Sequence, residues 1–225
     1  MFHVKHMIKA AFFDFNGTLY FDQDINKITW KKTIDKLSDN KIDFEPFFKD
    51  RRSVIDKLVI IDAYKAINKK YSEQEIDFWV DYKEKEYRKY GVDHNRTVLS
   101  PGAKEVLDYI KSKNIPIILC TSSIIENVDY YFKEFNLDRW FKREQTVYDD
   151  GNYTSKAQMY KKCADICNVR IEESIIFEDS LKSIKQAIEA GAKTIVSINN
   201  PESINQKEIV QNIKDFRELD YSLFD

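Results

Sequence analysis

Residues 8–19, IKAAFFDFNGTL, form an apolar run that breaks abruptly into a polar turn. A run of this length that ends in a glycine turn is typical of a strand buried on both faces, as in a parallel sheet. Asp14 then lies at the carboxyl end of the strand, where open α/β sheets bind ligands. The backbone N–H groups of the following turn can face an anion, so a nucleophilic carboxylate could meet a phosphate there. The same residue types also form ordinary turns, so this stretch alone leaves both interpretations open.

The composition limits what the chain can be. Its 225 residues, 43% of them hydrophobic, can bury a core in one large domain or two unequal ones. A net charge of −2 provides no basic field for nucleic acid or an anionic membrane. No apolar run is long enough for a transmembrane helix, and three cysteines without a CxxC pair fit reduced thiols in a cytosol. We therefore expect a cytoplasmic protein that binds neither nucleic acid nor membrane.

Residues 21–96 differ in character from the rest of the chain. No glycine occurs between Gly17 and Gly91, and apolar residues recur at helical spacing. A capping box at residues 72–75 opens a helix that carries an aromatic stripe, which we interpret as core rather than as a ligand platform: Phe78, Trp79 and Tyr82. The sequence therefore predicts a helical insert after the first strand.

From residue 97 onward, helices and strands alternate. Helices are expected at residues 103–113, 124–135, 156–167 and 180–190, and strands at 115–120, 174–177 and 193–198, with a short strand near 146–148. Alternation of this kind predicts an α/β fold with a doubly wound parallel sheet, built by residues 1–20 and 97–225. A polar tail at residues 202–218 has helical potential.

Three of the predicted strands end in polar groups. They are Asp14-x-Asn16-x-Thr18, Thr121-Ser122 and Glu178-Asp179. Because the carboxyl ends of parallel strands converge on one edge of a sheet, we expect these groups to lie close together. Two carboxyl-bearing strand ends repel each other in a buried crevice unless a cation or a proton relieves them. Such oxygen ligands suit Mg²⁺, which takes one or two carboxylates and leaves positions for water and substrate phosphate.

Taken in order, these motifs resemble the haloacid dehalogenase (HAD) superfamily of phosphohydrolases, specifically its β-phosphoglucomutase-like subgroup with a helical cap. The resemblance covers about residues 8–198 and has four parts: FFDFNGTL at 12–19, LCTSS at 119–123, Lys156, and FEDSLKSIKQAIEAGAKTIVSI at 177–198. It implies a Rossmann-like catalytic core, residues 1–20 and 97–225, with a cap domain inserted at residues 21–96.

The resemblance implies roles for the acidic motifs. Asp14 would attack phosphorus and form an aspartyl-phosphate. The Asp14 carboxylate, the backbone carbonyl of Asn16 and the Asp179 carboxylate would hold Mg²⁺, and Glu178 would be a further ligand or lie behind the ligands. Glu178, Asp179 and Ser180 could instead form the N-terminal cap of the helix that follows, a position that acidic residues favour.

The remaining candidates are polar or basic. The resemblance implies that the Thr121 hydroxyl bonds a phosphoryl oxygen and that Lys156 neutralises charge on the transferring group. Thr18, Ser122 and Arg51 are candidate substrate contacts, with Arg51 gripping a distal anionic group. Each has a plainer alternative: Thr121 and Ser122 could cap the next helix, and the two basic residues could be solvated charges.

Asn16 is the main departure from the family pattern. Most relatives have a second aspartate there, which protonates the leaving oxygen and later activates water. An asparagine amide cannot carry that proton. General acid–base catalysis is worth about 10²- to 10⁴-fold in rate, so turnover would be slow unless another group supplies it. Some relatives with the same DFNGT motif have a histidine of the cap domain at the position that corresponds to Asn26 in this chain.

The leading hypothesis is a Mg²⁺-dependent phosphatase that acts on a small phosphorylated metabolite, such as a sugar phosphate, as a monomer or weak dimer. A phosphoglucomutase-type phosphotransferase is the alternative among enzymes, although it would need acid and base help that Asn16 cannot give. Asn16 and Asn26 also motivate a different class, a catalytically weakened protein that binds a phosphorylated ligand.

Overall fold

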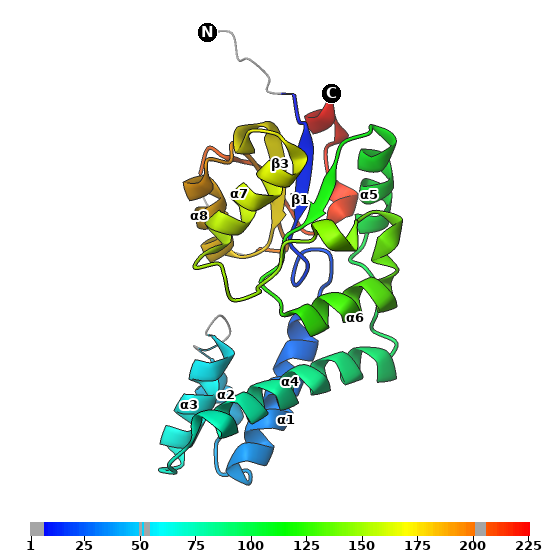
Figure 1. Cartoon of the computed structure of the whole chain (residues 1–225). Helices are drawn as coiled ribbons and strands as arrows, with labels where there is room; N and C mark the ends of the chain where they lie inside the picture. Colours follow the sequence, from blue (N-terminus) through cyan, green and yellow to red (C-terminus); the bar gives the residue numbers. More distant parts are fainter. Residues whose placement is uncertain (1–6, 50, 52–54, 201–205) are drawn as a thin grey trace. The chain divides into compact units, whose positions relative to one another are not determined.

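The chain divides into two compact units in a computed structural model that describes residues 7–49, 51, 55–200 and 206–225. One unit comprises residues 1–21 and 98–225 and the other residues 22–97 (Figure 1). We call them the α/β unit and the helical unit. Their assignment as catalytic core and cap remains a prediction.

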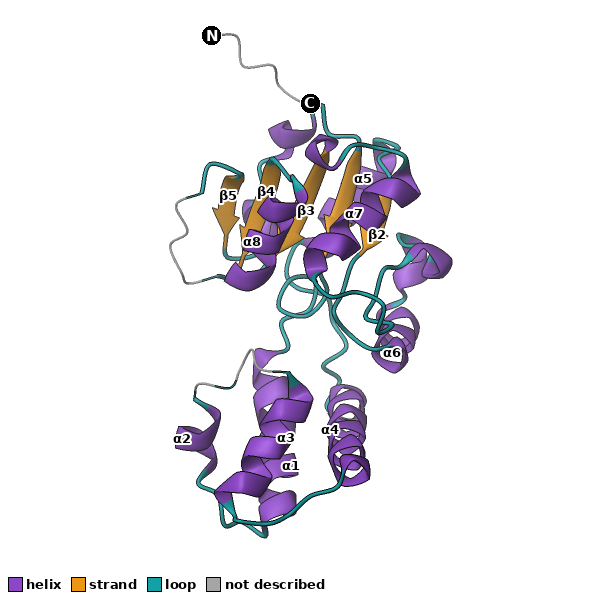
Figure 2. Ribbon diagram, turned by 60° about the vertical axis from the view of Figure 1, so that its left-hand side comes forward, coloured by secondary structure: helices purple, strands orange, loops and turns teal. Residues whose placement is uncertain are grey.

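A five-stranded parallel sheet with strand order β2-β1-β3-β4-β5 forms the centre of the α/β unit (Figure 2). The strands are β1 (Ala10–Phe13), β2 (Ile117–Leu119), β3 (Ser174–Glu178), β4 (Thr194–Ile198) and β5 (Ile209–Ile213). All four residues of β1 are buried, as expected for a strand covered on both faces. In the register, Phe13 pairs with Leu119 on one side and with Phe177 on the other. The residues that follow these three positions therefore lie side by side at the carboxyl edge of the sheet.

Helices cover both faces of this sheet. Helices α7 (Lys156–Cys167) and α8 (Leu181–Ala190) share a core with the side chains that one face presents, including Phe12 and Ile176. On the opposite face, the Phe13 ring stacks on Phe177 with centroids 4.3 Å apart, and both rings lie near Phe216. Phe216 begins the short helix η4 (Phe216–Glu218), which packs against α5 (Ala103–Ser112). The predicted α/β fold with a doubly wound parallel sheet is confirmed.

Two expectations for the α/β unit are wrong. The expected strand at residues 146–148 is only an isolated bridge between Cys120 and Val147. The tail at residues 202–218, to which we assigned helical potential, contains in its described part β5 and only the short 3-10 helix η4, and a second one, η5 (Tyr221–Phe224), follows it. Pairing with the open edge of β4 overrides the local helical preference of this segment, because strand formation depends on the partner more than on propensity. Residues 201–205 of the tail lie outside the described residues.

The described residues of the helical unit form four helices. They are α1 (Gln23–Ser38), α2 (Phe44–Phe48), α3 (Asp56–Ala66) and α4 (Glu73–Asp93). The predicted capping box begins α4, since the Ser72 hydroxyl accepts from the Glu75 N–H at 3.2 Å. The aromatic stripe on α4 is core only in part: Trp79 packs against the core, whereas the Phe78 side chain is 57% exposed.

Several helices end on a residue in the left-handed conformation. Asp39, Asn136 and Asn168 occupy this position after α1, α6 (Ile125–Phe135) and α7, with φ between 51° and 54°. Gly191 does so after α8, with φ of 110°. Short polar side chains tolerate this conformation, so a chain with only five glycines can still terminate its helices tightly. Within the described ranges, no helix is both long and apolar enough to cross a membrane.

Candidate functional site

Three carboxylates meet at the carboxyl ends of β1 and β3. Asp14 follows β1, Glu178 ends β3 and Asp179 follows it, and one oxygen of each lies within 4.8 Å of the others. Burial, together with repulsion from the neighbouring carboxylates, raises the pKa of Asp14 to about 7 and that of Asp179 to about 8. Buried oxygen ligands with excess negative charge fit a hard divalent cation such as Mg²⁺.

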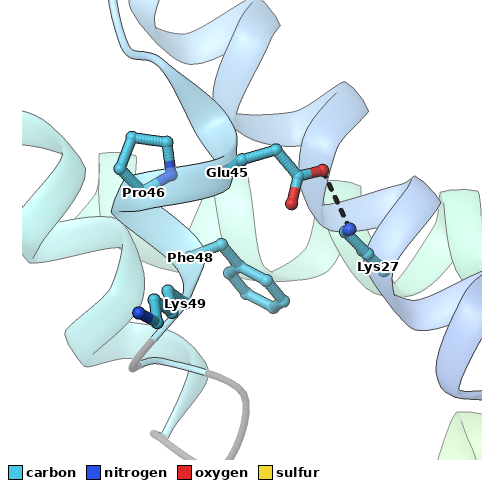
Figure 3. Close-up of a pocket in the computed structure, with 5 residues that line it drawn as sticks. All are labelled: Lys27, Glu45, Pro46, Phe48 and Lys49. Atoms are coloured by element: carbon cyan, nitrogen blue, oxygen red, sulfur yellow. Dashed lines mark ion pairs between the residues drawn. The ribbon is translucent and has the colours of Figure 1, made fainter.

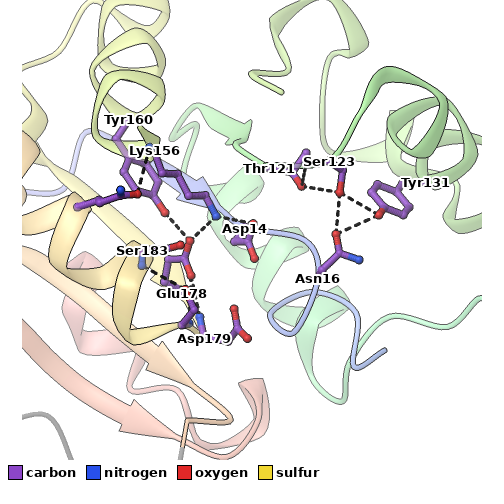
Figure 4. A network of polar contacts seen from close by, with 12 residues as sticks. Asp14, Asn16, Thr121, Ser123, Tyr131, Lys156, Tyr160, Glu178, Asp179 and Ser183 are labelled. Atoms are coloured by element: carbon purple, nitrogen blue, oxygen red, sulfur yellow. Dashed lines mark hydrogen bonds and ion pairs between the residues drawn. The ribbon is translucent and has the colours of Figure 1, made fainter. Parts of the chain in front are cut away.

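A buried lysine balances part of this charge. Lys156 is the first residue of α7, and its ammonium donates hydrogen bonds to Asp14 Oδ1 at 2.6 Å and to Glu178 Oε1 (Figure 4). Burial disfavours the lysine charge, but Asp14 and Glu178 outweigh it and raise the pKa of Lys156 above its ordinary value. The ammonium therefore stays charged and fixes one oxygen of Asp14. The alternative that Lys156 is a solvated charge is wrong.

Glu178 holds Lys156 in place. Its Oε1 also accepts from the Tyr160 hydroxyl at 2.7 Å, and its Oε2 accepts from the backbone N–H groups of Asp179 and Ser180 at 3.0 and 3.3 Å. Both oxygens are thus engaged within the protein, which favours a place behind the ligands over direct coordination. The sequence interpretation missed Tyr160, although its spacing of four residues from Lys156 on one helix could have indicated it.

The turn after β1 approaches Asp179 closely. Gly17 has φ of 79°, and a Cβ atom there would lie 2.1 Å from Asp179 Oδ2. Only glycine combines this backbone conformation with the space that the carboxylate needs. The turn and the end of β3 therefore converge, as the sequence predicted for the strand ends.

The side chain of Asn16 belongs to a separate network beside the carboxylates (Figure 4). Asn16 Oδ1 accepts from the Ser123 hydroxyl at 2.9 Å and from the Tyr131 hydroxyl at 3.0 Å. The Thr121 hydroxyl donates to Ser123 Oγ at 3.2 Å. Phe15 stacks on the Tyr131 ring with centroids 3.9 Å apart, which fixes the ring in α6. Ser123 and Tyr131 were not singled out from the sequence; the LCTSS segment contains the first but gave no sign of the second.

The other predicted contacts are placed differently. Thr18 is fully buried, and among the described residues its hydroxyl has no hydrogen-bond partner, whereas Ser122 is exposed. Arg51 lies in the helical unit, where it donates to Asp62 Oδ2 at 3.2 Å and stacks on the Phe47 ring. The structure thus groups the acidic residues with Lys156, and Asn16 with Thr121, while these three residues join neither group.

The capping alternative is wrong for Thr121 and Ser122, and for residues 178–180 it is confirmed at Ser180 alone. Helix α6 has Ile124 at its N-cap and no side-chain cap bond, so neither Thr121 nor Ser122 caps it. Helix α8 is capped by Ser180, whose hydroxyl accepts from the Ser183 N–H at 3.1 Å. The acidic pair at the end of β3 is therefore not needed to begin the helix.

A separate hollow of about 280 Å³ lies in the helical unit (Figure 3). Its lining residues are Lys27, Glu45, Pro46, Phe48 and Lys49. Lys27 forms an ion pair with Glu45 at 2.8 Å, which neutralises one of the two ammonium groups. None of the predicted site residues lines this hollow.

A family model described as haloacid dehalogenase-like hydrolase matches residues 8–191, which include the whole carboxylate cluster. The chain belongs to the haloacid dehalogenase-like hydrolase family. It is accordingly an enzyme of the hydrolase class. The predicted resemblance to this family is confirmed.

Individual members of the HAD family resemble the chain along most of its length. A probable pseudouridine-5′-phosphatase of Saccharomyces cerevisiae is 25% identical over 87% of this chain and 84% of its own. The crystal structure of a HAD hydrolase from Entamoeba histolytica has a TM-score of 0.82 and 26% identity, covering 96% of this chain and 97% of that one. A β-phosphoglucomutase from Clostridium difficile, at 22% identity and a TM-score of 0.75, covers 96% of this chain and 95% of its own and shares the fold.

Proposed function

We propose that this chain is a Mg²⁺-dependent phosphatase that hydrolyses a small phosphorylated metabolite through an aspartyl-phosphate on Asp14. The observation that supports this most is the group formed by Asp14, Asp179, Glu178 and Lys156 at the carboxyl ends of two adjacent parallel strands. The similarity to a probable pseudouridine-5′-phosphatase supports a sugar-containing phosphate ester as the substrate.

Asp14 is the nucleophile in this proposal. Its Oδ1 is held by Lys156 at 2.6 Å, which leaves Oδ2 to attack phosphorus. Asp14, Asp179 and the backbone carbonyl of Asn16 would hold the Mg²⁺, which supplies positive charge to the transferring phosphoryl group when it is bound.

Positive charge from the protein complements that of the metal. The Lys156 ammonium stays protonated beside the nucleophile and stabilises the charge that spreads over the phosphoryl oxygens. Glu178 and Tyr160 hold that ammonium in position through a shared carboxylate oxygen. A role for Arg51 in gripping a distal anionic group remains a prediction, as does a phosphate contact from Thr121.

Turnover of 4-nitrophenyl phosphate and pseudouridine 5′-phosphate, with Mg²⁺ or with chelator, tests this function. Asp14→Asn should lower kcat/KM by about 10⁴-fold or more, because the amide is not a nucleophile. Asp165→Asn is the matched control, since it makes the same change at an exposed position of α7 and should leave turnover unchanged.

Two results would contradict the proposal. Full activity of the Asp14→Asn variant would exclude Asp14 as the nucleophile, and equal activity in chelator would exclude the Mg²⁺ requirement. Tight binding of phosphorylated compounds by the wild-type chain without any turnover would instead support the ligand-binding alternative that Asn16 motivates.

A further inference from the structure

Two hydroxyl groups fix the carbonyl end of the Asn16 side chain. The Ser123 and Tyr131 hydroxyls lie 2.9 and 3.0 Å from Asn16 Oδ1, and Tyr131 is fully buried under Phe15. The amide oxygen is therefore the end that points into this hydroxyl pair. Two hydroxyl donors on one amide oxygen fix the orientation of the amide group.

The hydroxyl protons of this network are directed toward Asn16. The Thr121 hydroxyl donates to Ser123 Oγ and accepts from the Ser123 N–H, while Ser123 and Tyr131 donate to Asn16 Oδ1. The chain of hydrogen bonds thus ends on an amide. An amide can donate or accept a hydrogen bond, but it does not take up or release a proton in the way that a carboxyl group does.

The ammonium of Lys156 and the hydroxyl of Tyr160 are engaged as well. Lys156 directs its ammonium at Asp14 and Glu178, and the Tyr160 hydroxyl donates to Glu178. The protons of Lys156 and Tyr160 in these bonds are therefore held by the carboxylates. The groups seen to bond Asp14 Oδ1 and Asn16 Oδ1 are thus an ammonium and two hydroxyls, which are much weaker acids than a carboxylic acid or a histidine that protonates a leaving oxygen.

Given the proposed function, we infer that the site hydrolyses phosphate esters of acidic hydroxyl groups in preference to esters of simple alcohols. Such hydroxyls are those of phenols and enols and the anomeric hydroxyl of a sugar. A leaving group of this kind departs as a more stable anion than a simple alkoxide, so its departure depends less on a proton from the enzyme. An ester of a primary alcohol would have to release an alkoxide, which is a far poorer leaving group without protonation.

Both steps of this reaction balance without an enzyme acid. In the first, Asp14 Oδ2 forms a bond to phosphorus, the ester P–O bond breaks, and the leaving group takes the electron pair as an anion. In the second, a water oxygen bonds to phosphorus and the P–O bond to Asp14 breaks. Both water protons end on the inorganic phosphate, which leaves as the monoanion, and Asp14 is regenerated as a carboxylate.

Two matched pairs of esters test the inference in the presence of Mg²⁺. Glucose 1-phosphate and glucose 6-phosphate differ in the acidity of the esterified hydroxyl, and so do 4-nitrophenyl phosphate and phenyl phosphate. We expect the ester of the more acidic hydroxyl to have the higher kcat/KM in both pairs. Equal kcat/KM values within both pairs would overturn the inference and would show that a proton donor comes from elsewhere in the chain.

The Asn16→Asp variant provides the sharper comparison. One carboxyl oxygen can accept the Ser123 and Tyr131 hydroxyls as the amide oxygen does, and the other can carry a proton. We expect kcat/KM for glucose 6-phosphate to rise by about 10²- to 10⁴-fold, with a much smaller change for 4-nitrophenyl phosphate. The ratio of kcat/KM for glucose 6-phosphate to kcat/KM for 4-nitrophenyl phosphate is compared between the wild type and the variant. Differences in binding between the two esters therefore cancel.

Asn136→Asp is the control, since it introduces the same charge at an exposed helix end. Thermal unfolding of each variant shows whether it is folded, and the wild-type pairs test the inference independently if Asn16→Asp is not. A folded Asn16→Asp variant with an unchanged ratio would overturn the inference while leaving the phosphatase function intact. No hydrolysis of any of the four esters by the wild type or by Asn16→Asp would reject the proposed function, and the inference with it.

Discussion

Each unit of this protein buries a lysine between two carboxylates. In the α/β unit the ammonium of Lys156 bonds Asp14 and Glu178. In the helical unit Lys83 bonds Glu84 Oε1 at 2.8 Å and Asp56 Oδ2 at 3.1 Å. Only 5% of the Lys156 side chain and 8% of the Lys83 side chain are exposed, so burial alone does not distinguish them.

The surroundings of the two lysines differ. A third carboxylate, that of Asp179, lies beside Lys156, and the groups come from strand ends and a helix start that are far apart in sequence. Lys83 lies within α4, next to its partner Glu84, and its ammonium lies 5.2 Å from the Trp30 ring centre and 5.8 Å from that of Tyr87. Aromatic faces stabilise a buried cation without any further ion.

A buried lysine between carboxylates is therefore not by itself a sign of catalysis. What sets the cluster of the α/β unit apart is its larger excess of negative charge, three carboxylates to one lysine instead of two to one, at a sheet edge where the backbone turns. This excess is unfavourable in the protein alone and becomes favourable when a cation is bound. We accordingly interpret the Lys83 group as structural and the Lys156 group as functional.

Replacing each lysine by methionine tests this comparison most directly. Lys83→Met should lower the free energy of unfolding by about 3 kcal/mol, because it leaves the buried Glu84 and the partly buried Asp56 without their cation. Lys156→Met should lower kcat/KM by about 10²- to 10³-fold, as expected for the loss of a charge that stabilises the transition state. Urea unfolding and kinetics with Mg²⁺ measure both effects. A Lys83→Met variant with normal stability and greatly reduced kcat/KM would show that the Lys83 group is also functional.

The response of stability to Mg²⁺ and pH should separate the two groups as well. The folded protein without metal keeps protons on Asp14 and Asp179 up to pKa values of about 7 and about 8, whereas the unfolded chain releases them near pH ~4. Between these limits the folded state binds more protons, so its stability falls as the pH rises. Mg²⁺ at 100 times its Kd should add about 2.7 kcal/mol at neutral pH by displacing those protons.

Thermal unfolding between pH 5 and pH 8, with chelator and with Mg²⁺, measures this second effect. Asp179→Asn should abolish most of the Mg²⁺ stabilisation, whereas Asp56→Asn, which changes the carboxylate beside Lys83, should retain it. Equal Mg²⁺ stabilisation in the two variants would argue against a metal site in the α/β unit.

The smallest expected effect concerns two buried tyrosines that donate to carboxylates. Tyr160 bonds Glu178 and Tyr87 bonds Asp22, each at 2.7 Å. Either change to phenylalanine should cost about 1.5–3 kcal/mol of unfolding free energy, the worth of a hydrogen bond to a charged group. Only Tyr160→Phe should also lower kcat/KM, because it loosens the carboxylate that holds Lys156. A larger kinetic effect from Tyr87→Phe would reverse this assignment.

Local patterns in the sequence predicted most of the fold. The apolar run of β1, the capping box of α4 and the alternation after residue 97 each depend on neighbours in sequence, which a single chain displays directly. The prediction for the C-terminal tail was wrong because β5 forms by pairing with β4, a contact that a local sequence pattern does not show. The prediction that Phe78 is a core residue was wrong for a similar reason, since periodicity does not show which face of a long helix is covered.

The location of the candidate site could be predicted from the polar strand ends, but the residues that support it could not. Asp14 and Asp179 could be proposed because they follow predicted strands, whereas Lys156 was proposed only through the resemblance to the HAD superfamily. Tyr131 is one aromatic residue among several in α6, and only the folded chain shows that its hydroxyl reaches Asn16. The direction in which the Asn16 amide points is likewise a property of packing rather than of sequence.

Three helix ends are places where a glycine substitution should raise the thermal stability of the protein. Asp39, Asn136 and Asn168 each hold a conformation that glycine adopts more easily, while Gly191 already exploits this preference. Improved termination of a helix is commonly worth about 0.5–2 kcal/mol. Because these three positions lie outside both polar clusters, a heat-resistant version of this enzyme could be assembled there without altering its chemistry.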